Sequence, residues 1–467
     1  MAEDKSRWIS EQVRMVMERV RGARALPFQD VLSTEMVAQV VSDTGTAWRE
    51  CAWSPEVTVW TFLTQVLSAD HSCRDAVAKL RMQQLSDGQI PVSPDTGPYC
   101  KARQRLPEEL PMEMARRAGG ELDRCVPRPA TFLGGRLIRM VDGTTISMPD
   151  TAANQQAYPQ PSTQTPGVGF PLARIVALLS FHSGAIRELA IAPYAGKETG
   201  ETALFRQMFD RLNPGEIVVG DTYFGNWWTI AMLKSRGVDG IFPLHQLRTC
   251  DFRRGKRLEF EDHVVSWAKP PRPQWMDPAT YTSLPEALTV RELRVHSDDP
   301  TTRVDEITLV TTMLDPVTAP RDQISQAYHW RWDAEPDLRS IKCSLQMDVL
   351  RCKSPEMVRK EISMHLMAYN LIRTVIAESA AEYHVDPRSL SFKGALQSIN
   401  AFRSTIVLAA TTDLPLLFDE LLGMIASHPV RNRPNRVEPR AVKRRPKSMK
   451  FLTVPRSVAR KLCPETS

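Results

Sequence analysis

The sequence predicts a mixed α/β protein, in which a core of strands and helices is interrupted by a β-rich insertion and flanked by helical regions. Three observations lead to this prediction. Strand-like apolar segments follow one another from about Leu133, helix and strand patterns alternate after them, and apolar residues recur at helical spacing towards both ends. With 467 residues, 42% of them hydrophobic and 24% charged, the chain is long enough for two or three globular domains.

The predicted core begins with three strands, over residues 136–148, 174–182 and 185–192, with Ser183-Gly184 as a tight turn between the last two. Helix, strand, helix and strand are then expected in turn, over residues 199–212, 216–220, 226–235 and 240–244. Three antiparallel strands followed by alternating helix and strand are the layout of a ribonuclease H-like α/β core. Residues 245 to about 318 interrupt it with strand-like, proline-rich sequence.

Both flanks carry signals for helix starts. Ser54-Pro55-Glu56 places a capping serine before a first-turn proline, and Ser354-Pro355-Glu356 starts a second, long helix. Apolar residues also follow helical spacing from Trp8 to Val20, and a helical pattern runs from Arg321 to about Ser379. Its second half has an apolar stripe that we expect to be core, formed by Val358, Ile362, Leu366, Ile372 and Ile376.

Charge and cysteine usage narrow the classes of function. The net charge is +6, but the segment from Arg431 to Lys461 holds twelve Lys or Arg and one acid, Glu438. Such a tail suggests a polyanionic partner such as DNA, although a solvated, disordered tail explains it equally well. Eight cysteines without a C-x-x-C pair argue against a zinc ribbon and a secreted disulfide scaffold, and favour free thiols in a reducing cytoplasm.

No motif for a membrane or a nucleotide is visible. The longest apolar stretch, around Ile175 to Phe181, is far too short to cross a bilayer, and the N-terminus has no apolar signal segment. Gly196-Lys197 lacks the surrounding residues of a Walker A loop, and the nine histidines show no metal-ligand spacing. We therefore expect no membrane partner and no nucleotide cofactor.

Two aspartates close apolar strands in the predicted core. Asp142 follows the apolar run 137–141, and Asp221 follows 217–220. A carboxylate at a strand end is held by a rigid sheet and still faces solvent, which is the placement that metal-dependent phosphoryl transfer needs. Each aspartate alone is more often an ordinary turn residue.

A third acidic residue lies in the predicted helix after the insertion. Arg331, Glu335 and Lys342 follow Tyr328 at offsets of 3, 7 and 14 residues. At the α-helical period these four side chains share a stripe about 60° wide, which suits a metal and phosphate site. A solvated helix face with an ordinary Arg331–Glu335 pair accounts for the same spacing.

The motifs resemble those of a known family. Y-x2-R-x3-E-x6-K over residues 328–342 is similar to the signature of one branch of insertion-sequence DDE transposases, the cut-and-paste enzymes that form hairpin ends. V-D-G-T-T at 141–145 and V-G-D-T-Y-F-G at 219–225 resemble its other blocks. Less diagnostic similarity is present at 51–55, 99–107 and 432–447, so the likeness covers nearly the whole chain.

This resemblance implies a site and its partners. Asp142, Asp221 and Glu335 would be catalytic and bind two Mg²⁺ (or Mn²⁺) ions, while Tyr328, Arg331 and Lys342 would hold phosphates of double-stranded DNA at a transposon end. A homodimer in a synaptic complex is the family expectation, as is a cytoplasmic, nucleoid-associated protein of a prokaryotic host. Further DNA-binding candidates are three tryptophans, any of which can instead be merely packed, and three tail cations: Trp267, Trp275, Trp332, Lys443, Arg444 and Arg445.

The resemblance also gives the expected regions a meaning. We expect a helical DNA-binding region (1–125), the first part of the core (126–244), the β-rich insertion (245–318), the second part of the core with the Glu335 helix (319–380), and a C-terminal helical region with the basic tail (381–467).

One residue departs from a smooth helix. Pro336 directly follows Glu335, and proline removes a backbone donor and disfavours helical geometry in the preceding residue. Either the helix kinks here or a new helix begins at Pro336.

Two alternative functions also stay open, a ribonuclease H-like nuclease without strand transfer and a non-catalytic DNA-binding descendant of a transposase.

Overall fold

The structure is a computed structural model that describes residues 34–43, 45, 51–296, 306–409, 412–430 and 450–462. Side chains at 34–36, 332–335 and 407–408 are outside this description. The predicted N-terminal pattern Trp8–Val20 and the tail residues Lys443, Arg444 and Arg445 also lie outside the described residues.

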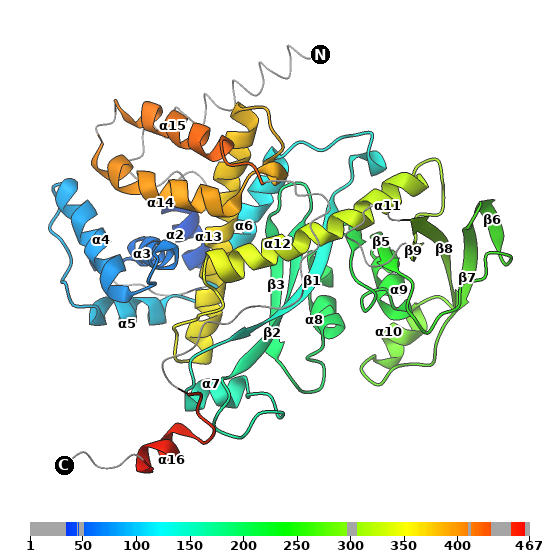
Figure 1. The fold of residues 1–467 in the computed structure, drawn as a ribbon, viewed down its shortest axis with the longest axis horizontal. Coiled ribbons are helices and arrows are strands. Elements are labelled where there is room, and N and C mark those ends of the chain that lie inside the picture. Colours follow the sequence, from blue (N-terminus) through cyan, green and yellow to red (C-terminus); the bar gives the residue numbers. More distant parts are fainter. Residues whose placement is uncertain are drawn as a thin grey trace. The chain divides into compact units, whose positions relative to one another are not determined.

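The chain forms two compact units (Figure 1). The first contains Met1–Pro127, Leu179–Glu188 and Asp333–Val430, and the second contains Arg128–Leu178, Leu189–Trp332 and Arg431–Ser467. Each unit is therefore built from segments that are distant in the sequence.

The first unit is helical. Its described helices are α2 (Thr34–Asp43), α3 (Pro55–Leu67), α4 (Cys73–Ser86), α5 (Gly97–Arg105), α6 (Glu109–Cys125), α12 (Ala334–Arg339), α13 (Pro355–Glu382), α14 (Phe392–Leu408) and α15 (Leu414–Ala426). Helix α13 is central, because it packs against α3, α6, α14 and α15. All five residues of its predicted apolar stripe are buried, so their assignment to the core is confirmed.

Both predicted helix starts are confirmed. Ser54 precedes α3, and its hydroxyl accepts a hydrogen bond from the Val57 amide at 3.2 Å. Ser354 occupies the N-cap position of α13, with Pro355 in the first turn. In both helices the proline costs little, because a first-turn residue has no intrahelical acceptor for its N–H.

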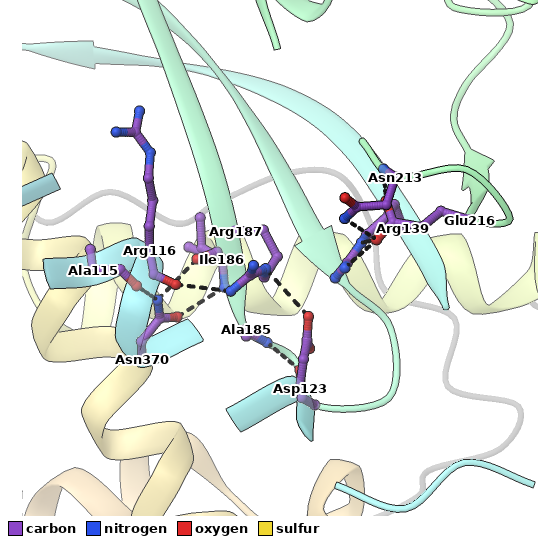
Figure 2. A network of polar contacts seen from close by, with 11 residues as sticks. Ala115, Arg116, Asp123, Arg139, Ala185, Ile186, Arg187, Asn213, Glu216 and Asn370 are labelled. Carbon is purple, nitrogen blue, oxygen red and sulfur yellow. Dashed lines mark hydrogen bonds and ion pairs between the residues drawn. The ribbon is translucent and has the colours of Figure 1, made fainter. Parts of the chain in front are cut away.

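A buried amide connects three segments of the first unit (Figure 2). Asn370 on α13 donates hydrogen bonds from Nδ2 to the carbonyls of Ala115, on α6, at 2.8 Å and of Ile186 at 2.9 Å. Its Oδ1 accepts from the Ile186 amide at 2.9 Å. Because Asn370 is fully buried, each of these groups would be costly to leave without a partner, so the contact specifies one arrangement of the three segments.

A nine-stranded mixed sheet has the strand order β3-β2-β1-β4-β5-β9-β8-β7-β6. The strands are β1 (Ile138–Ser147), β2 (Leu172–Ser180), β3 (Ile186–Pro193), β4 (Ile217–Val219), β5 (Asp239–Pro243), β6 (Lys256–Glu259), β7 (Asp262–Ala268), β8 (Ala287–His296) and β9 (Glu306–Thr311). Strands β1, β4 and β5 pair in parallel. The order of β3 to β5 is that of a ribonuclease H-like core, which confirms the predicted fold class.

The insertion continues the core sheet. Strand β9 pairs antiparallel with β5, and β8, β7 and β6 follow outwards as antiparallel neighbours. A fully buried ion pair connects two of these strands, because Arg291 on β8 donates from Nε to Asp262 on β7 at 2.8 Å. Arg291 also donates from Nη1 to the Ala319 carbonyl at 2.7 Å, so its charge is fully hydrogen-bonded.

Helices α8 (Glu201–Gln207) and α9 (Trp227–Ser235) contribute to the apolar core of the second unit, together with residues from the sheet. Three shorter helices also belong to this unit, namely α7 (Ala152–Ala157), α10 (Pro278–Ser283) and α16 (Arg456–Lys461).

The predicted helix from Arg321 to about Ser379 is not regular. Helix α11 (Arg321–His329) passes into a 3₁₀ segment, Trp330–Asp333, and then into α12 and a π-helical segment, Ser340–Ser344. Residues 345–354 form a loop before α13, so the helical region is divided there, in agreement with the predicted helix start at Ser354. The 3₁₀ segment lies where Pro336 withholds an N–H from the carbonyl of residue 332.

Candidate active site

A buried ion pair aligns the two strands that lead to the predicted aspartates. Arg139 on β1 donates to Glu216, just before β4, from Nε at 3.1 Å and from Nη2 at 2.5 Å (Figure 2). Each side chain is only 4% exposed, and the second oxygen of Glu216 accepts from the Asn213 amide at 3.2 Å. A slip of β4 along β1 would leave these charges buried and unpaired, so the pair holds the register.

This register places Asp142 and Asp221 at equivalent positions. Met140 on β1 is paired directly with Val219 on β4, and each aspartate lies two residues beyond its member of that pair. Neighbouring strands are about 4.8 Å apart, so the two carboxylates lie close together. Asp221 follows the end of β4, whereas β1 continues through Asp142 to Ser147, so the prediction that Asp142 closes its strand was wrong. Both aspartates are partly exposed.

Backbone amides orient both carboxylates. The Gly143 amide donates to Asp142 Oδ1 at 2.9 Å, and the Tyr223 amide donates to Asp221 Oδ1, also at 2.9 Å. Each bond fixes the orientation of its carboxylate. Tyr223 itself is 70% exposed beside Asp221, an aromatic ring that the strand-end pattern did not single out.

A third carboxylate, Glu201, lies beside these aspartates and was missed from the sequence. A Cβ atom on Gly143 would lie 2.6 Å from the Glu201 side-chain carboxyl carbon, so only glycine at 143 leaves room for this group. Burial raises the pKa of Glu201, the charge of Asp221 raises it further, and Arg174 lowers it. Glu201 is the first residue of α8, a position where an acid is common on any helix, so spacing alone could not have found it.

Tyr328, predicted as a phosphate contact, lies near Asp221, and Arg331, predicted in the same role, lies beside Tyr328. Burial raises the pKa of Tyr328, the nearby Arg331 guanidinium lowers it through its charge and a hydrogen bond, and the charge of Asp221 raises it. The Tyr328 hydroxyl therefore keeps its proton at neutral pH and can donate to an anion. Asp142, Glu201, Asp221, Tyr328 and Arg331 all belong to the second unit.

Glu335 is the second residue of α12, in the first unit, and its side chain is not among those described. Two residues later, Asp337 is 1% exposed and accepts hydrogen bonds from Arg373 on α13 and, at 2.7 Å, from Arg388. This buried carboxylate fastens α12 within its unit. A 3₁₀ segment and a π segment interrupt the α-helix between Tyr328 and Lys342. The α-helical rotation per residue therefore does not describe the relative directions of the side chains that were predicted to share one stripe.

The tryptophans differ in their surroundings. Trp267 is 6% exposed, its indole Nε1 donates to Glu292 at 2.8 Å, and Arg248 covers its ring at 3.8 Å. Trp275 is partly exposed, with the Arg206 guanidinium 3.7 Å from its ring centroid. The side chain of Trp332 is outside the described set. A stacking role for any of them stays a prediction.

With this geometry in view, comparison with known proteins is informative. A family model described as the transposase DDE domain matches residues 133–371, which is more than half of the chain. The chain belongs to this family. The matched range contains every strand described above and all three predicted catalytic residues, so this transposase is a DDE-type protein whose partner is DNA and whose activity uses a divalent metal.

Two known proteins are similar to this chain over most of its length. Transposase InsG for insertion sequence element IS4, from Escherichia coli (strain K12), is 25% identical over 444 residues, which cover 91% of this chain and 93% of that protein. The piggyBac transposase synaptic complex with hairpin DNA is a structural neighbour at 10% identity and a TM-score of 0.41, covering 88% of this chain and 86% of that one. That score is too low to indicate function.

The residues fit a divalent cation. Asp142, Glu201 and Asp221 offer only carboxylate oxygens, the ligands that Mg²⁺ and Mn²⁺ prefer. Neighbouring acids also repel one another, as Asp221 does Glu201, and a bound cation would relieve this cost. In the described part of the chain, no helix has both the length and the apolar character of a membrane span.

Proposed function

We propose that this transposase cleaves the ends of an insertion sequence and joins them to target DNA, with Asp142, Asp221 and Glu335 as its catalytic, metal-binding residues. The observation that carries the proposal is the equivalent placement of Asp142 and Asp221 on paired strands, with the Glu201 carboxylate beside them. The similarity to an insertion-sequence transposase, at 25% identity over 91% of this chain, supports DNA ends as the substrate.

Two divalent ions, when bound, would activate the attacking water or 3′-hydroxyl and stabilise the leaving oxygen. Asp142 and Asp221 would bind these ions through their carboxylates, which backbone amides hold in place. Glu335 would complete the set from the start of α12. Glu201 would serve as a further ligand or accept a proton, for which its raised pKa suits it.

The neighbouring side chains would hold the DNA backbone. The protonated Tyr328 hydroxyl and the Arg331 guanidinium would donate to phosphate oxygens near Asp221, and Lys342 would add a cation further along the chain. The tail cations Lys443, Arg444 and Arg445 would make sequence-tolerant phosphate contacts that weaken as salt rises. Exposed Tyr223, or one of Trp267, Trp275 and Trp332, would stack on a displaced base.

The proposal also includes the branch of the family to which this enzyme belongs. The spacing of Tyr328, Arg331, Glu335 and Lys342 favours the branch that forms hairpinned ends, acting as a homodimer that brings two DNA ends together. The five expected regions, from the helical DNA-binding region 1–125 to the tail region 381–467, stay part of this proposal. We expect the protein to act at the nucleoid of a prokaryotic host.

The decisive experiment uses linear DNA bearing the element's terminal repeats, a target plasmid and Mg²⁺. End cleavage followed by transfer into the target supports the proposal, and a hairpin on the released end supports the assignment to the hairpin-forming branch. Nicking without preference for the ends would indicate a nuclease, and binding without cleavage would indicate a non-catalytic descendant. Either of those two results contradicts the proposed function.

A further inference from the structure

A second group of potential metal ligands lies in the insertion, on strands and a loop that the proposed active site does not use. The donor atoms of Cys250, His263 and Glu292 all lie within 4.8 Å of one another. His263 on β7 is paired directly with Glu292 on β8, and Cys250 comes from the loop between β5 and β6. A thiol, an imidazole and a carboxylate therefore converge from three segments of the second unit.

The distances are close to those of a tetrahedral zinc site. Cys250 Sγ is 3.7 Å from His263 Nε2, and the same nitrogen is 2.9 Å from Glu292 Oε2. Metal–ligand bonds of 2.0 to 2.3 Å at tetrahedral angles put neighbouring ligand atoms about 3.3 to 3.8 Å apart. Small rotations of the Glu292 carboxylate would therefore suffice to admit an ion.

The contacts of His263 leave its Nε2 facing the Glu292 carboxylate, where a cation could bind. Its Nδ1 lies 2.7 Å from the Arg254 carbonyl, which can only accept, so Nδ1 carries a hydrogen. Its Nε2 faces the Glu292 carboxylate, which also accepts when ionised. The His263 and Glu292 side chains are both at least 94% buried, so a cation bound between Nε2 and the carboxylate would be shielded from water.

The surroundings hold the three ligands as outer partners of metal sites do. The Arg254 carbonyl fixes the orientation of the His263 ring, and the Trp267 indole donates to Glu292 Oε1 at 2.8 Å. Burial raises the pKa of the Cys250 thiol to about 12, and a hydrogen bond to Glu292 adds to this effect. Without a cation nearby, the thiol thus keeps its proton.

We propose that Cys250, His263 and Glu292 bind one Zn²⁺ ion, with water as a fourth ligand, and that this ion fastens the loop of residues 244–255 to β7 and β8. A mixed sulfur, nitrogen and oxygen set favours zinc, whereas Mg²⁺ prefers oxygen ligands alone. The loop includes two strongly exposed cations, since the side chains of Arg253 and Arg254 are 91% and 83% exposed. The ion would thereby hold a basic loop in a fixed position, ready for DNA.

The first test measures zinc in the purified, untagged full-length protein after exchange into buffer containing Zn²⁺ and removal of free ions. Wild type and the Asp142→Ala variant should each retain about one zinc per chain, whereas Cys250→Ser and His263→Asn should lose it. Cys51→Ser, at an exposed cysteine outside the group, is the matched control and should retain it. Retention by Cys250→Ser, or no zinc in wild type, would overturn the proposal.

Two measurements that need no active enzyme distinguish the loss of a zinc ligand from the loss of zinc through misfolding. Co²⁺ added to stripped wild type should give a thiolate charge-transfer band in the near ultraviolet, absent in Cys250→Ser, whose hydroxyl preserves the hydrogen bond to Glu292. Trypsin should cut after Arg253 or Arg254 several times faster once zinc is removed. Identical cleavage with and without zinc would mean that the ion does not fasten the loop, and a missing band in wild type would overturn the proposed metal site.

Retention of zinc by the Asp142→Ala variant keeps this test independent of the active site. If DNA cleavage fails in every variant while zinc binding follows Cys250 and His263, the proposed function fails and the zinc site stands. If cleavage requires Asp142 and Asp221 but no zinc binds, the reverse holds.

Discussion

Asp142 and Asp221 lie the same distance beyond a directly paired couple of residues, Met140 and Val219, on adjacent parallel strands. The relationship follows from the register of β1 and β4. The buried ion pair between Arg139 and Glu216, which precede the two aspartates in the sequence, stabilises this register. The rigidity of the sheet is thus transmitted directly to the two carboxylates.

Replacing either aspartate by asparagine should abolish DNA cleavage and preserve DNA binding. Asparagine retains the shape and the backbone hydrogen bond but loses the charge that attracts a divalent cation. We expect cleavage to fall by more than about 100-fold, since even groups that only orient metal ligands are worth 10- to 100-fold. Cleavage of end-containing DNA and gel-shift affinity should be measured together, with Asp150→Asn as an exposed control. Unchanged cleavage in Asp142→Asn or Asp221→Asn refutes the site.

The Glu201→Gln variant should be more stable than wild type and less active. Burial and the charge of Asp221 raise the pKa of Glu201, so the ionised group destabilises the fold above that raised pKa. Below 4.5, the ordinary value, the group is protonated whether folded or unfolded and the cost is absent. The gain in melting temperature should therefore be present at pH 7 and shrink as the pH falls towards 4.5.

The control for this variant is Glu198→Gln, at an exposed acid three residues earlier. It should leave DNA cleavage unchanged, whereas Glu201→Gln should lower it. A Glu201→Gln variant that is no more stable at pH 7, or that cleaves as fast as wild type, would remove Glu201 from the site.

Glu216→Ala should cost about 3 to 5 kcal/mol, because it leaves the Arg139 guanidinium buried without its carboxylate. Urea unfolding of the full chain measures the loss. Asp210→Ala, which removes an acid that is 90% exposed from its pair with Arg236, should cost less than about 1 kcal/mol. The double variant Arg139→Met with Glu216→Leu should recover most of the stability, and if it does not, the pair has a role beyond charge balance.

Asp337→Ala should lower both stability and cleavage while sparing DNA affinity. The change leaves Arg373 and Arg388 without their shared buried carboxylate, at a cost of about 3 to 5 kcal/mol, and loosens the helix that begins just before Glu335. Asp419→Ala, at an exposed position of the same unit, is the matched control. If cleavage by folded Asp337→Ala equals that of wild type, Asp337 is purely structural.

The sequence predicted those features that depend on local pattern. An apolar run that ends in an aspartate indicates a carboxylate held by a packed strand, so Asp142 and Asp221 could be singled out. Only Asp221 follows the end of its strand, because β1 continues to Ser147. The placement of Glu201 depends on how α8 packs beside β1, and an acid in a first helical turn carries no such information. Cys250, His263 and Glu292 come together only through the pairing of β7 with β8, so their irregular spacing hides them.

The helix containing Glu335 shows the limit of periodicity. A constant rotation per residue placed Tyr328, Arg331, Glu335 and Lys342 on one face, but the chain changes from α to 3₁₀, back to α and then to π winding across these positions. The proline was visible in the sequence, whereas the length of chain over which the winding adjusts was not.

Replacing Pro336 by leucine should leave cleavage intact or improve it. The new N–H could donate to the carbonyl of residue 332, which would let α-helical winding replace the 3₁₀ segment Trp330–Asp333. Pro336 is the third residue of α12, where proline is tolerated, so the gain in stability should be small. Pro355→Leu, in the first turn of α13, is the matched control for the same chemical change. Cleavage of end-containing DNA and the far-ultraviolet circular dichroism should be compared between the two variants. A loss of cleavage confined to Pro336→Leu would mean that the altered winding itself positions Glu335, and that the proline belongs to the catalytic architecture.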